Sequence, residues 1–375
     1  MNEKIKNIVV CSLLGGFILL FSLLAIFLPK PEFLDSERRE PAEFPTLTLE
    51  SIMKDGTEYK DSFMKQFDDK YTPDNFPFRD FFRNIKGFVG TYIFAKRDKD
   101  GIFVEDGYAA EMQEEINQSS IEHASKIFGL IYEKYLKKLG INPYISIVPD
   151  KAYFLAAENG YLSMDYEKFV EEMIASVEFA EYIDIMSSLS IEDYYKSDTH
   201  WRQEKLLPIA EILVEKMGGE YDSEFVVNTL DNLFFGVYAG RAPKPLNPDT
   251  LYYLTNSNTE HLIVKNYDKG GAVVGVYDME KAHGKDPYDM FLGGENALVT
   301  IENPNAKTDR ELVIFRDSYG RSIIPLLTDN YKKITVVDIR YRSWMTLGSL
   351  GIFKEGQDVL FLYSTLVLNN SSELK

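Results

Sequence analysis

The chain has 375 residues, 45% of them hydrophobic, with a formal net charge of −18 and an isoelectric point near 4.8. This acidic balance argues against a nucleic-acid-binding protein, because phosphates would be repelled. The length after the first thirty residues is enough for a large core in one elaborated domain, or in one domain with a sizeable insertion.

The first thirty residues predict a membrane anchor. Lys4 and Lys6 precede an unbroken apolar or small run from Ile8 to Leu28, and Pro29 ends it. As a helix this run would be about 30 Å long, enough to cross a bilayer's hydrocarbon core. The run is long for a signal peptide and has no small-x-small cleavage site, so an uncleaved signal anchor is favoured over the alternative, a removed targeting peptide. The lysines indicate a cytoplasmic N-terminus and an extracytoplasmic remainder.

The single cysteine, Cys11, lies inside this apolar run. The rest of the chain therefore has no disulfide, no thiol nucleophile and no cysteine metal site. An exported domain without disulfides favours a bacterial cell envelope over an animal secretory pathway.

Residues 31–100 are predicted to form a linker and an N-terminal docking segment. The first half is rich in charge and proline, and the second places Arg79 and Arg83 among phenylalanines. A basic aromatic face of this kind would suit a polysaccharide or an acidic partner. We favour a structural interpretation, in which Arg79 pairs with a carboxylate and the phenylalanines form core.

Residues 101–375 are predicted to form one α/β domain. A hairpin with an Asp-Gly turn over 101–107 comes first. Helices and buried strands then alternate, which predicts a parallel sheet flanked by helices. The predicted helices cover 110–139, 166–177, 201–217 and 319–327, and the predicted strands cover 144–148, 182–186, 311–315, 333–340 and 358–363.

Two parts of this domain are candidates for contact with a ligand. Ligands of parallel sheets bind beyond the carboxyl ends of the strands, where Asp150 and Lys151 would stand, although an ordinary solvated loop would look the same. Residues 220–300 lose clear periodicity and predict a largely β insertion. Loops over a rigid sheet commonly select substrate, so this insertion is a candidate lid or acceptor-sugar surface.

A candidate nucleophile lies in the turn Arg316-Asp317-Ser318, between a predicted strand and a predicted helix. Backbone N–H groups and the positive end of the helix dipole converge there, so negative charge developing beside Ser318 would be stabilised. Serine hydrolases and acyltransferases need this arrangement. The structural alternative is that Asp317 or Ser318 only caps the helix.

The candidate base is His200, in the segment Asp198-Thr199-His200-Trp201. A serine hydroxyl needs a base, and the base needs a carboxylate to fix its tautomer. Asp198 is two residues before His200, so both project from the same side of an extended segment. Trp201 would pack the histidine ring. Alternatively, Asp198 caps the following helix and His200 sits in its first turn.

These two segments together resemble the DHHW protein family, which is similar to the alginate O-acetyltransferases of the SGNH-hydrolase-like superfamily. The resemblance extends over nearly the whole chain and includes residues 74–80, 148–151 and 338–341. Two positions depart from the family pattern. Thr199 stands at the second letter of the DHHW motif, where we expect a side chain that points away from its neighbours, and Arg316 stands where related turns have glycine.

The resemblance implies an extracytoplasmic O-acetyltransferase that acts on an envelope or exported polysaccharide through an acyl-serine. Ser318 would be the nucleophile, His200 the base and then the acid, and Asp198 the orienting carboxylate. Tyr341, with the Ser318 N–H, would hold the oxyanion, and Arg342 would stabilise or position the same charge. A membrane-bound O-acyltransferase would supply the acetyl group, and no cofactor is implied.

Three other functions stay open at this stage. An acetylesterase of the same fold would need the same residues, and a non-catalytic polysaccharide-binding or scaffold protein would keep the fold alone. A metal enzyme is the weakest alternative, because one histidine and one aspartate are too few ligands.

Overall fold

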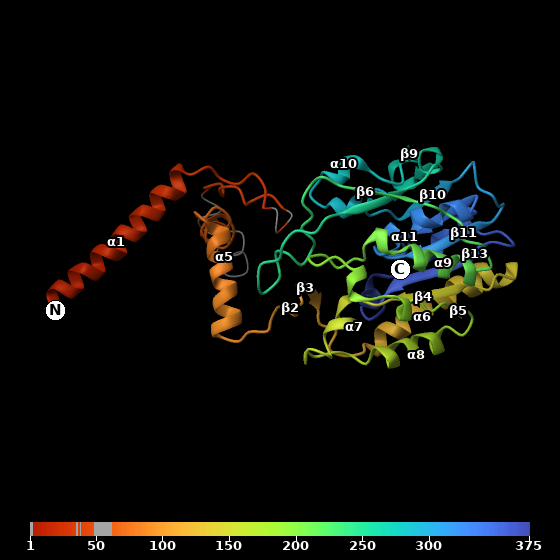
Figure 1. Ribbon diagram of the computed structural model, residues 1–375, viewed down its shortest axis with the longest axis horizontal. Helices are drawn as coiled ribbons and strands as arrows, with labels where there is room; N and C mark the ends of the chain where they lie inside the picture. Colours follow the sequence, from red (N-terminus) through yellow and green to blue (C-terminus); the bar gives the residue numbers. More distant parts are fainter. Residues whose placement is uncertain (1–2, 35–36, 38, 49–61) are drawn as a thin grey trace. The chain divides into compact units, whose positions relative to one another are not determined.

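The computed structural model describes residues 3–34, 37, 39–48 and 62–375. Parts of the predicted linker, at 35–36, 38 and 49–61, lie outside the described residues. The chain divides into two compact units (Figure 1). One contains residues 1–97 with 243–245, and the other contains residues 98–242 and 246–375.

The first unit begins with α1 (Glu3–Phe27), an apolar helix without buried residues. Within the described part of the chain, it is the one helix that is long and apolar enough to cross a membrane. Short helical segments follow, namely α3 (Phe63–Gln66), the π-helix η3 (Phe67–Tyr71), α4 (Thr72–Asp74), α5 (Arg79–Phe88) and the π-helix η4 (Val89–Ile93).

The predicted pairing of Arg79 with a carboxylate is confirmed, since its guanidinium binds Glu37. The prediction that the phenylalanines form core is wrong for several of them. Phe81 is 61% exposed and Phe78 is 57% exposed. The physical reason is the rotation of α5 about its axis. Its arginines face Glu37 in the same unit, so phenylalanines on the opposite side of the helix are exposed.

The second unit is built on an eight-stranded sheet in the order β5-β4-β13-β11-β12-β10-β8-β9. The first five strands are parallel, and β10, β8 and β9 extend the sheet with antiparallel pairs. Their bounds are β4 (Tyr144–Val148), β5 (Glu181–Tyr182), β8 (Ile263–Asn266), β9 (Ala272–Val274), β10 (Leu298–Glu302), β11 (Glu311–Arg316), β12 (Lys333–Val337) and β13 (Asp358–Ser364).

Helices cover both faces of this sheet (Figure 1). The helices of the second unit include α6 (Gln118–Ile131), α7 (Lys151–Leu155), α8 (Tyr166–Ser176), α9 (Leu207–Lys216), α10 (Met279–Ala282), α11 (Gly320–Leu327) and α12 (Thr365–Leu368). Of these, α7 packs against the hairpin and α10 packs in the insertion. Alternate residues of β11 serve opposite faces, because successive side chains of a strand point to opposite sides. Ile314 packs in the core with α9 and α11, while Val313 and Phe315 pack in the core with α6 and α8. A strand buried on both faces explains the continuous apolar run before the serine turn.

The predicted hairpin is confirmed, with β2 (Ile102–Glu105) paired to β3 (Tyr108–Glu111) after the short β1 (Asp98–Lys99). Asp106 and Gly107 both have positive φ, as a type I′ turn requires. The helix predicted over 110–139 is shorter, because β3 takes its first residues and Asn117 caps α6 just before Gln118.

The insertion at 220–300 was predicted to be largely β and is only partly so, since much of it lies outside its short strands. A two-stranded sheet joins β6 (Val226–Thr229) to β7 (Tyr252–Thr255), while β8 and β9 continue the main sheet. A small apolar core of its own holds the insertion together and includes Tyr195, Phe234, Tyr288 and Phe291. Two predicted strands are shorter than expected, since β5 ends at Tyr182 and β12 ends at Val337.

Candidate active site

Ser318 stands in the turn between β11 and α11, at the carboxyl end of the strand. The Asp317 carboxylate fixes this turn by accepting from the N–H of Tyr319 at 3.0 Å and from the N–H and hydroxyl of Ser364 at 2.7 and 2.6 Å. The Ser318 side chain does not cap the helix. Among the residues that the structure describes, its backbone N–H donates to no acceptor. A donor of this kind is available to a negative charge on a bound group.

His200 joins the serine to Asp198. Its Nε2 lies 2.8 Å from the Ser318 hydroxyl, and its Nδ1 lies 2.5 Å from Asp198 Oδ1. The same carboxylate oxygen accepts the backbone N–H of His200 at 3.0 Å. Asp198 therefore holds the histidine rather than capping α9, which begins only at Leu207. The two remote segments meet in one hydrogen-bonded chain.

Asp198 is fully buried but keeps its charge. Burial alone would raise the pKa of this carboxyl group. The His200 ring and the N–H groups of His200 and Val237 outweigh burial, so the pKa lies well below its usual value. A carboxylate in this state can orient an imidazole and stabilise its protonated form.

Trp201 ties the histidine segment to the start of α11. Its buried indole N–H donates to the carbonyl of Tyr319 and to the hydroxyl of Ser322, at 2.9 Å in each case. Trp201 therefore positions His200 through the backbone and through α11, while the ring that packs on the imidazole comes from elsewhere.

The expectation that the Thr199 side chain points away from its neighbours is wrong. Its hydroxyl lies 3.2 Å from the hydroxyl of Tyr319 and 3.2 Å from that of Tyr238. Tyr319 also donates to the Thr199 carbonyl at 2.7 Å. The cause is tertiary, since two tyrosines from distant segments converge on this loop.

Tyr288, in the 3-10 helix η12 (Pro287–Met290) of the insertion, covers the imidazole of His200. The two rings are stacked, with centroids 3.9 Å apart and an interplanar angle of 9°. The buried Tyr288 hydroxyl donates to Ser322 at 2.9 Å, so the same serine oxygen serves Tyr288 and Trp201. Sequence reasoning missed this residue, because no local pattern distinguishes it within the insertion.

The segment 234–238 supports Asp198 from the other side. The N–H of Val237 donates to Asp198 Oδ2 at 2.9 Å, and the N–H of Gly236 donates to the Ser197 hydroxyl at 3.0 Å. A Cβ on Gly236 would lie 2.3 Å from the Cα of Asp198, so this close approach requires glycine.

Lys151 lies in the interior, 2% exposed, rather than on a solvated loop. Its ammonium group donates to the carbonyls of Tyr195 and Lys196, at 2.8 and 3.1 Å. Burial lowers the pKa of Lys151 to about 7. Its neighbour Asp150 caps α7 and binds Thr365 and Tyr166, which places it away from solvent as well.

Tyr341 and Arg342 are not part of the hydrogen-bond network of Ser318 in the described part of the chain. Tyr341 is 46% exposed and lies against Arg340, while Arg342 is 3.9 Å from Asp268.

Arg316, the other departure from the family pattern, is fully buried and pairs with Asp338 at 2.9 Å. Gly320 makes room for it, since a Cβ there would lie 2.6 Å from the Cβ of Arg316. The guanidinium group therefore points into the interior rather than toward the serine hydroxyl.

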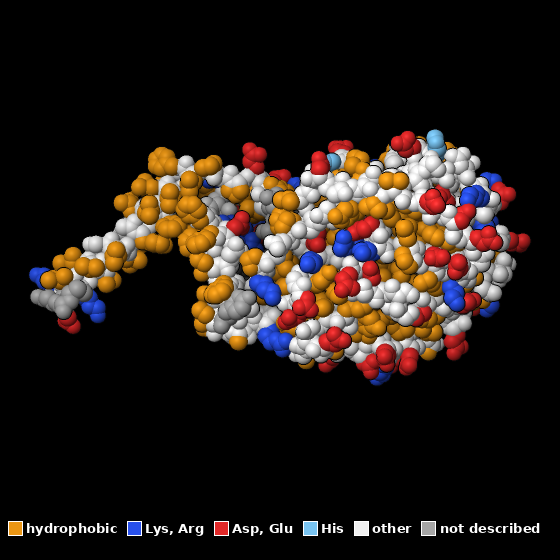
Figure 2. Space-filling view, viewed as in Figure 1, with side chains coloured by type: hydrophobic (Ala, Val, Ile, Leu, Met, Phe, Trp, Pro, Cys, Tyr) orange, Lys and Arg blue, Asp and Glu red, His pale blue; other side chains and the backbone are white. Residues whose placement is uncertain are grey.

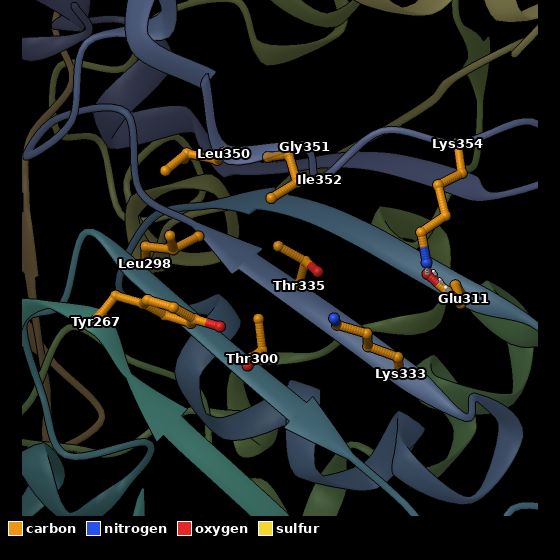
Figure 3. A pocket seen from close by; sticks show the side chains of 10 residues that line it. All are labelled: Tyr267, Leu298, Thr300, Glu311, Lys333, Thr335, Leu350, Gly351, Ile352 and Lys354. Carbon is orange, nitrogen blue, oxygen red and sulfur yellow. Dashed lines mark hydrogen bonds and ion pairs between the residues drawn. The ribbon is translucent and has the colours of Figure 1, made fainter. Parts of the chain in front are cut away.

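A separate pocket lies beside the strands β10 and β12 (Figure 3). Thr300 and Thr335 line its middle, and an ion pair between Lys354 and Glu311 closes one end. Ser318, His200 and Asp198 do not line it, so it is distinct from the hydrogen-bonded chain described above. Over the described ranges, no group of three or more histidine, cysteine or acidic side chains could hold a metal ion.

Comparison with known proteins confirms the resemblance to the DHHW family, but over a shorter range than the nearly whole chain that was expected. The model of the DHHW protein family matches residues 169–337, which include both motifs. No curated protein matches the sequence. The fold is shared with a DHHW family protein from Eubacterium siraeum, at 20% identity and a TM-score of 0.58, over 74% of this chain and 98% of that one.

Two structures of Bacillus cereus PatB1 share the fold as well. The structure with a sulfonyl adduct has 18% identity, a TM-score of 0.56, and coverage of 71% of this chain and 97% of that one. The structure without the adduct has 17% identity, the same TM-score, and coverage of 71% and 96%. These likenesses confirm the predicted α/β fold with a parallel sheet flanked by helices.

Proposed function

We propose that this chain is an extracytoplasmic O-acyltransferase that moves an acetyl group to a hydroxyl of an envelope or exported polysaccharide. The observation that carries the proposal is the continuous chain from Asp198 through His200 to Ser318, with donor–acceptor distances of 2.5 and 2.8 Å. This geometry lets a serine lose its proton to a base whose other nitrogen is already held by a carboxylate.

In the first half of the reaction, Ser318 Oγ attacks the acyl carbonyl carbon while His200 Nε2 takes the hydroxyl proton. Negative charge develops on the carbonyl oxygen, and the N–H of Ser318 is a donor for it. His200 then gives its proton to the leaving group as the bond to the carbonyl breaks. The Asp198 carboxylate stabilises the protonated imidazole during this step.

In the second half, His200 takes a proton from a polysaccharide hydroxyl, which attacks the acyl-serine. The serine leaves with the proton that His200 returns. Tyr341 as a further oxyanion donor, and Arg342 as a positioning cation, stay part of the proposal. A Tyr341→Phe variant tests the first of these roles, since loss of an oxyanion donor costs roughly a hundredfold or more in rate.

The membrane anchor supports the choice of donor. If α1 (Glu3–Phe27) stays attached, the domain remains at the extracytoplasmic surface of the cell membrane. A membrane-bound O-acyltransferase, which the family likeness implies as the acetyl source, would then be close to it. In this proposal, Trp201 and Lys151 are positioning residues rather than substrate contacts, because the side chains of both are buried.

Covalent labelling tests whether Ser318 is a nucleophile. One similar structure, that of PatB1, carries a sulfonyl adduct, so a sulfonyl fluoride is a suitable probe. We expect the full chain to gain one sulfonyl group, and Ser318→Ala and His200→Ala to gain none. The matched controls are Ser349→Ala and His283→Ala, which change an exposed serine and an exposed histidine. Labelling that persists in Ser318→Ala would overturn the proposal in favour of a non-catalytic polysaccharide-binding protein.

Product analysis separates transfer from hydrolysis. An acetylated donor ester is incubated with the unmodified protein, with and without an added polysaccharide fragment. A transferase forms acetylated polysaccharide and little free acetate, whereas an acetylesterase releases acetate at the same rate in both samples.

A further inference from the structure

The helix α5 (Arg79–Phe88) is amphipathic, and two arginines of its polar side face the interior of its unit. Arg79 and Arg83 both bind the carboxylate of Glu37. Burial raises the pKa of Glu37, and the three arginines near it outweigh burial and lower this pKa below its usual value. The inner side of α5 is therefore held by charge pairs.

The outer face of α5 consists of Phe81, Ile85 and Phe88. These residues are spaced by four and three positions, so they lie on one side of the helix. They are 61%, 43% and 57% exposed. Further large apolar residues at the two ends of the helix are also exposed, namely Phe78, Ile93 and Phe94. Figure 2 shows hydrophobic side chains gathered over this part of the chain and over α1.

This arrangement is the reverse of what water favours. In water, a helix buries its apolar side and exposes its charges, because apolar surface is unfavourable there. Contiguous exposed apolar surface of this size marks a site of contact with a membrane or another molecule. An apolar medium beside the outer face of α5 would explain why that face is exposed.

Contacts with α1 identify that medium. The ring of Phe21 lies 5.5 Å from the ring of Phe76, just before α5, and 5.7 Å from the ring of Phe82 within it. Phe21 is six residues before the end of α1 at Phe27, which is about 9 Å along the helix. If α1 spans the bilayer, Phe21 lies within the hydrocarbon core, and the rings that touch it lie at the lipid boundary.

We propose that α5 lies at the extracytoplasmic interface between water and the membrane that α1 spans, with Phe81, Ile85 and Phe88 in contact with lipid. This inference rests on the retained anchor of the proposed function, and it adds that the chain has a second, non-spanning contact with the same bilayer. Interfacial helices of this kind bury their apolar side several ångströms into the boundary between headgroups and acyl chains.

Spin labelling of the full chain tests this placement. Cys11→Ser gives a background without cysteine. Single cysteines are then introduced by Phe81→Cys and Phe88→Cys on the outer face, with Ile85→Cys as a second variant of that face should Phe81→Cys misfold. Lys86→Cys is the matched control, because Lys86 is exposed on the other side of the same helix. Leu14→Cys in α1 and Asp309→Cys in the second unit are the lipid and water references.

The proteins are reconstituted into vesicles of phosphatidylethanolamine and phosphatidylglycerol, and collision of each label with oxygen and with a water-soluble nickel complex is measured. We expect oxygen-to-nickel collision ratios on the outer face several-fold above that of Lys86→Cys and below that of Leu14→Cys, which lies near the middle of α1. Ratios equal to that of Asp309→Cys would overturn the inference. Labels that neither reagent reaches would also overturn it, in favour of a protein partner or a second copy of the chain.

The references separate this inference from the proposed function. A lipid signal at Leu14→Cys with a water signal on the outer face leaves the anchor intact and removes only the interfacial role of α5. A water signal at Leu14→Cys removes the anchor and the inference together. Sulfonylation of Ser318 in each variant reports the catalytic proposal and the folding of the second unit independently of the membrane.

Discussion

At the scale of single residues, the surroundings of His200 come from three segments, namely its own neighbours in 198–201, the insertion and the turn after β11. Asp198 holds one ring nitrogen, Ser318 meets the other, and Tyr288 lies flat against the ring. Trp201 fixes the backbone next to it. The imidazole consequently has one orientation and one tautomer before any substrate arrives, which is the preorganisation that proton transfer in acyl chemistry needs.

The stacked ring of Tyr288 predicts a difference between two substitutions. Tyr288→Phe keeps the stacking and loses only the hydrogen bond to Ser322, so its rate of sulfonylation should stay within about threefold of the unmodified chain. Tyr288→Leu removes the flat contact and should slow sulfonylation by about tenfold, or about 1.4 kcal/mol in the barrier. The rates of the two variants and of the unmodified chain are compared across a range of pH. Equal rates for the two variants would contradict a positioning role.

Buried Lys151 predicts how stability depends on pH. Its pKa is about 7 in the folded chain and about 10.4 in an unfolded one, so the unfolded chain binds more protons between these values. The unfolding free energy should therefore rise with pH above about 7, by at most about 1.4 kcal/mol per pH unit from this group, and should gain nothing from it at lower pH. Urea unfolding of the wild-type chain and of Lys151→Met measures this. The unfolding free energy of Lys151→Met should rise less steeply with pH. Parallel curves of unfolding free energy against pH for the two proteins would contradict the lowered pKa of Lys151.

The three residues of the chain Asp198–His200–Ser318 were predictable because their signals are local. An Asp-x-His-Trp segment and an Asp-Ser turn after an apolar strand are visible in a few residues each. Tyr288 and the inward turn of Lys151 were not predictable, since both depend on which distant segments meet. The expectation for Thr199 was wrong for the same reason.

At the scale of elements, the loop before His200 depends on the segment 234–238. This segment belongs to the insertion, yet its N–H groups bind Ser197 and Asp198. The insertion thus reaches the site twice, through this segment and through Tyr288. Its aperiodic sequence hid both contacts, whereas the strands and helices of the main sheet were predicted from their apolar patterns.

Gly236→Ala should disable the site through this contact. The new Cβ would lie 2.3 Å from the Cα of Asp198, which is an overlap. Because this is a backbone atom, the overlap can be relieved only if the backbone at Asp198 or at residue 236 moves. A displacement of about 1 Å at the base can cost roughly a hundredfold in rate, so sulfonylation of Ser318 should fall by about that factor.

The matched control for this variant is Gly129→Ala in α6, where the nearest atom to a Cβ is a Phe179 side-chain carbon at 3.8 Å. Its sulfonylation rate should equal that of the unmodified chain, and its stability should not fall, because alanine favours a helix over glycine. A Gly236→Ala variant that matched this control would show that the loop tolerates displacement.

Helix boundaries were the least predictable elements. Residues 110–117 contain several helix-favouring side chains, which extended the predicted helix toward the hairpin. In the structure, pairing of β3 with β2 takes residues 108–111, and the side chain of Asn117 starts α6. Strand pairing, which is a tertiary interaction, and side-chain capping, which is a local one, override the weak helix propensity of these residues.

At the scale of the whole molecule, the prediction that failed was about solvent. Burial of phenylalanines such as Phe78 and Phe81 follows from the rule that apolar side chains leave water. The rule assumes that water surrounds the segment, whereas the proposed placement of α5 puts it beside the membrane that the run from Ile8 to Leu28 predicts. The anchor and the aromatic segment had to be interpreted together, and their contact through Phe21 was not visible in the sequence.

The proposed topology predicts the outcome of fractionation. In bacterial cells, the chain should remain in the membrane fraction after carbonate extraction, because α1 would span the bilayer. An epitope at the C-terminus should be digested by protease added to spheroplasts, while one at the N-terminus should be protected. Release of the chain by carbonate would indicate a cleaved targeting peptide instead, and protection of the C-terminal epitope would reverse the orientation.

The position of Trp201 gives the chain a built-in optical reporter. Only two tryptophans are present, and Trp344 is partly exposed whereas Trp201 is fully buried between the histidine segment and α11. With Trp344 replaced by phenylalanine, the remaining emission would come from the indole that joins those two segments. Its wavelength and intensity would then follow, in real time, the docking of the histidine segment onto the segment that carries Ser318.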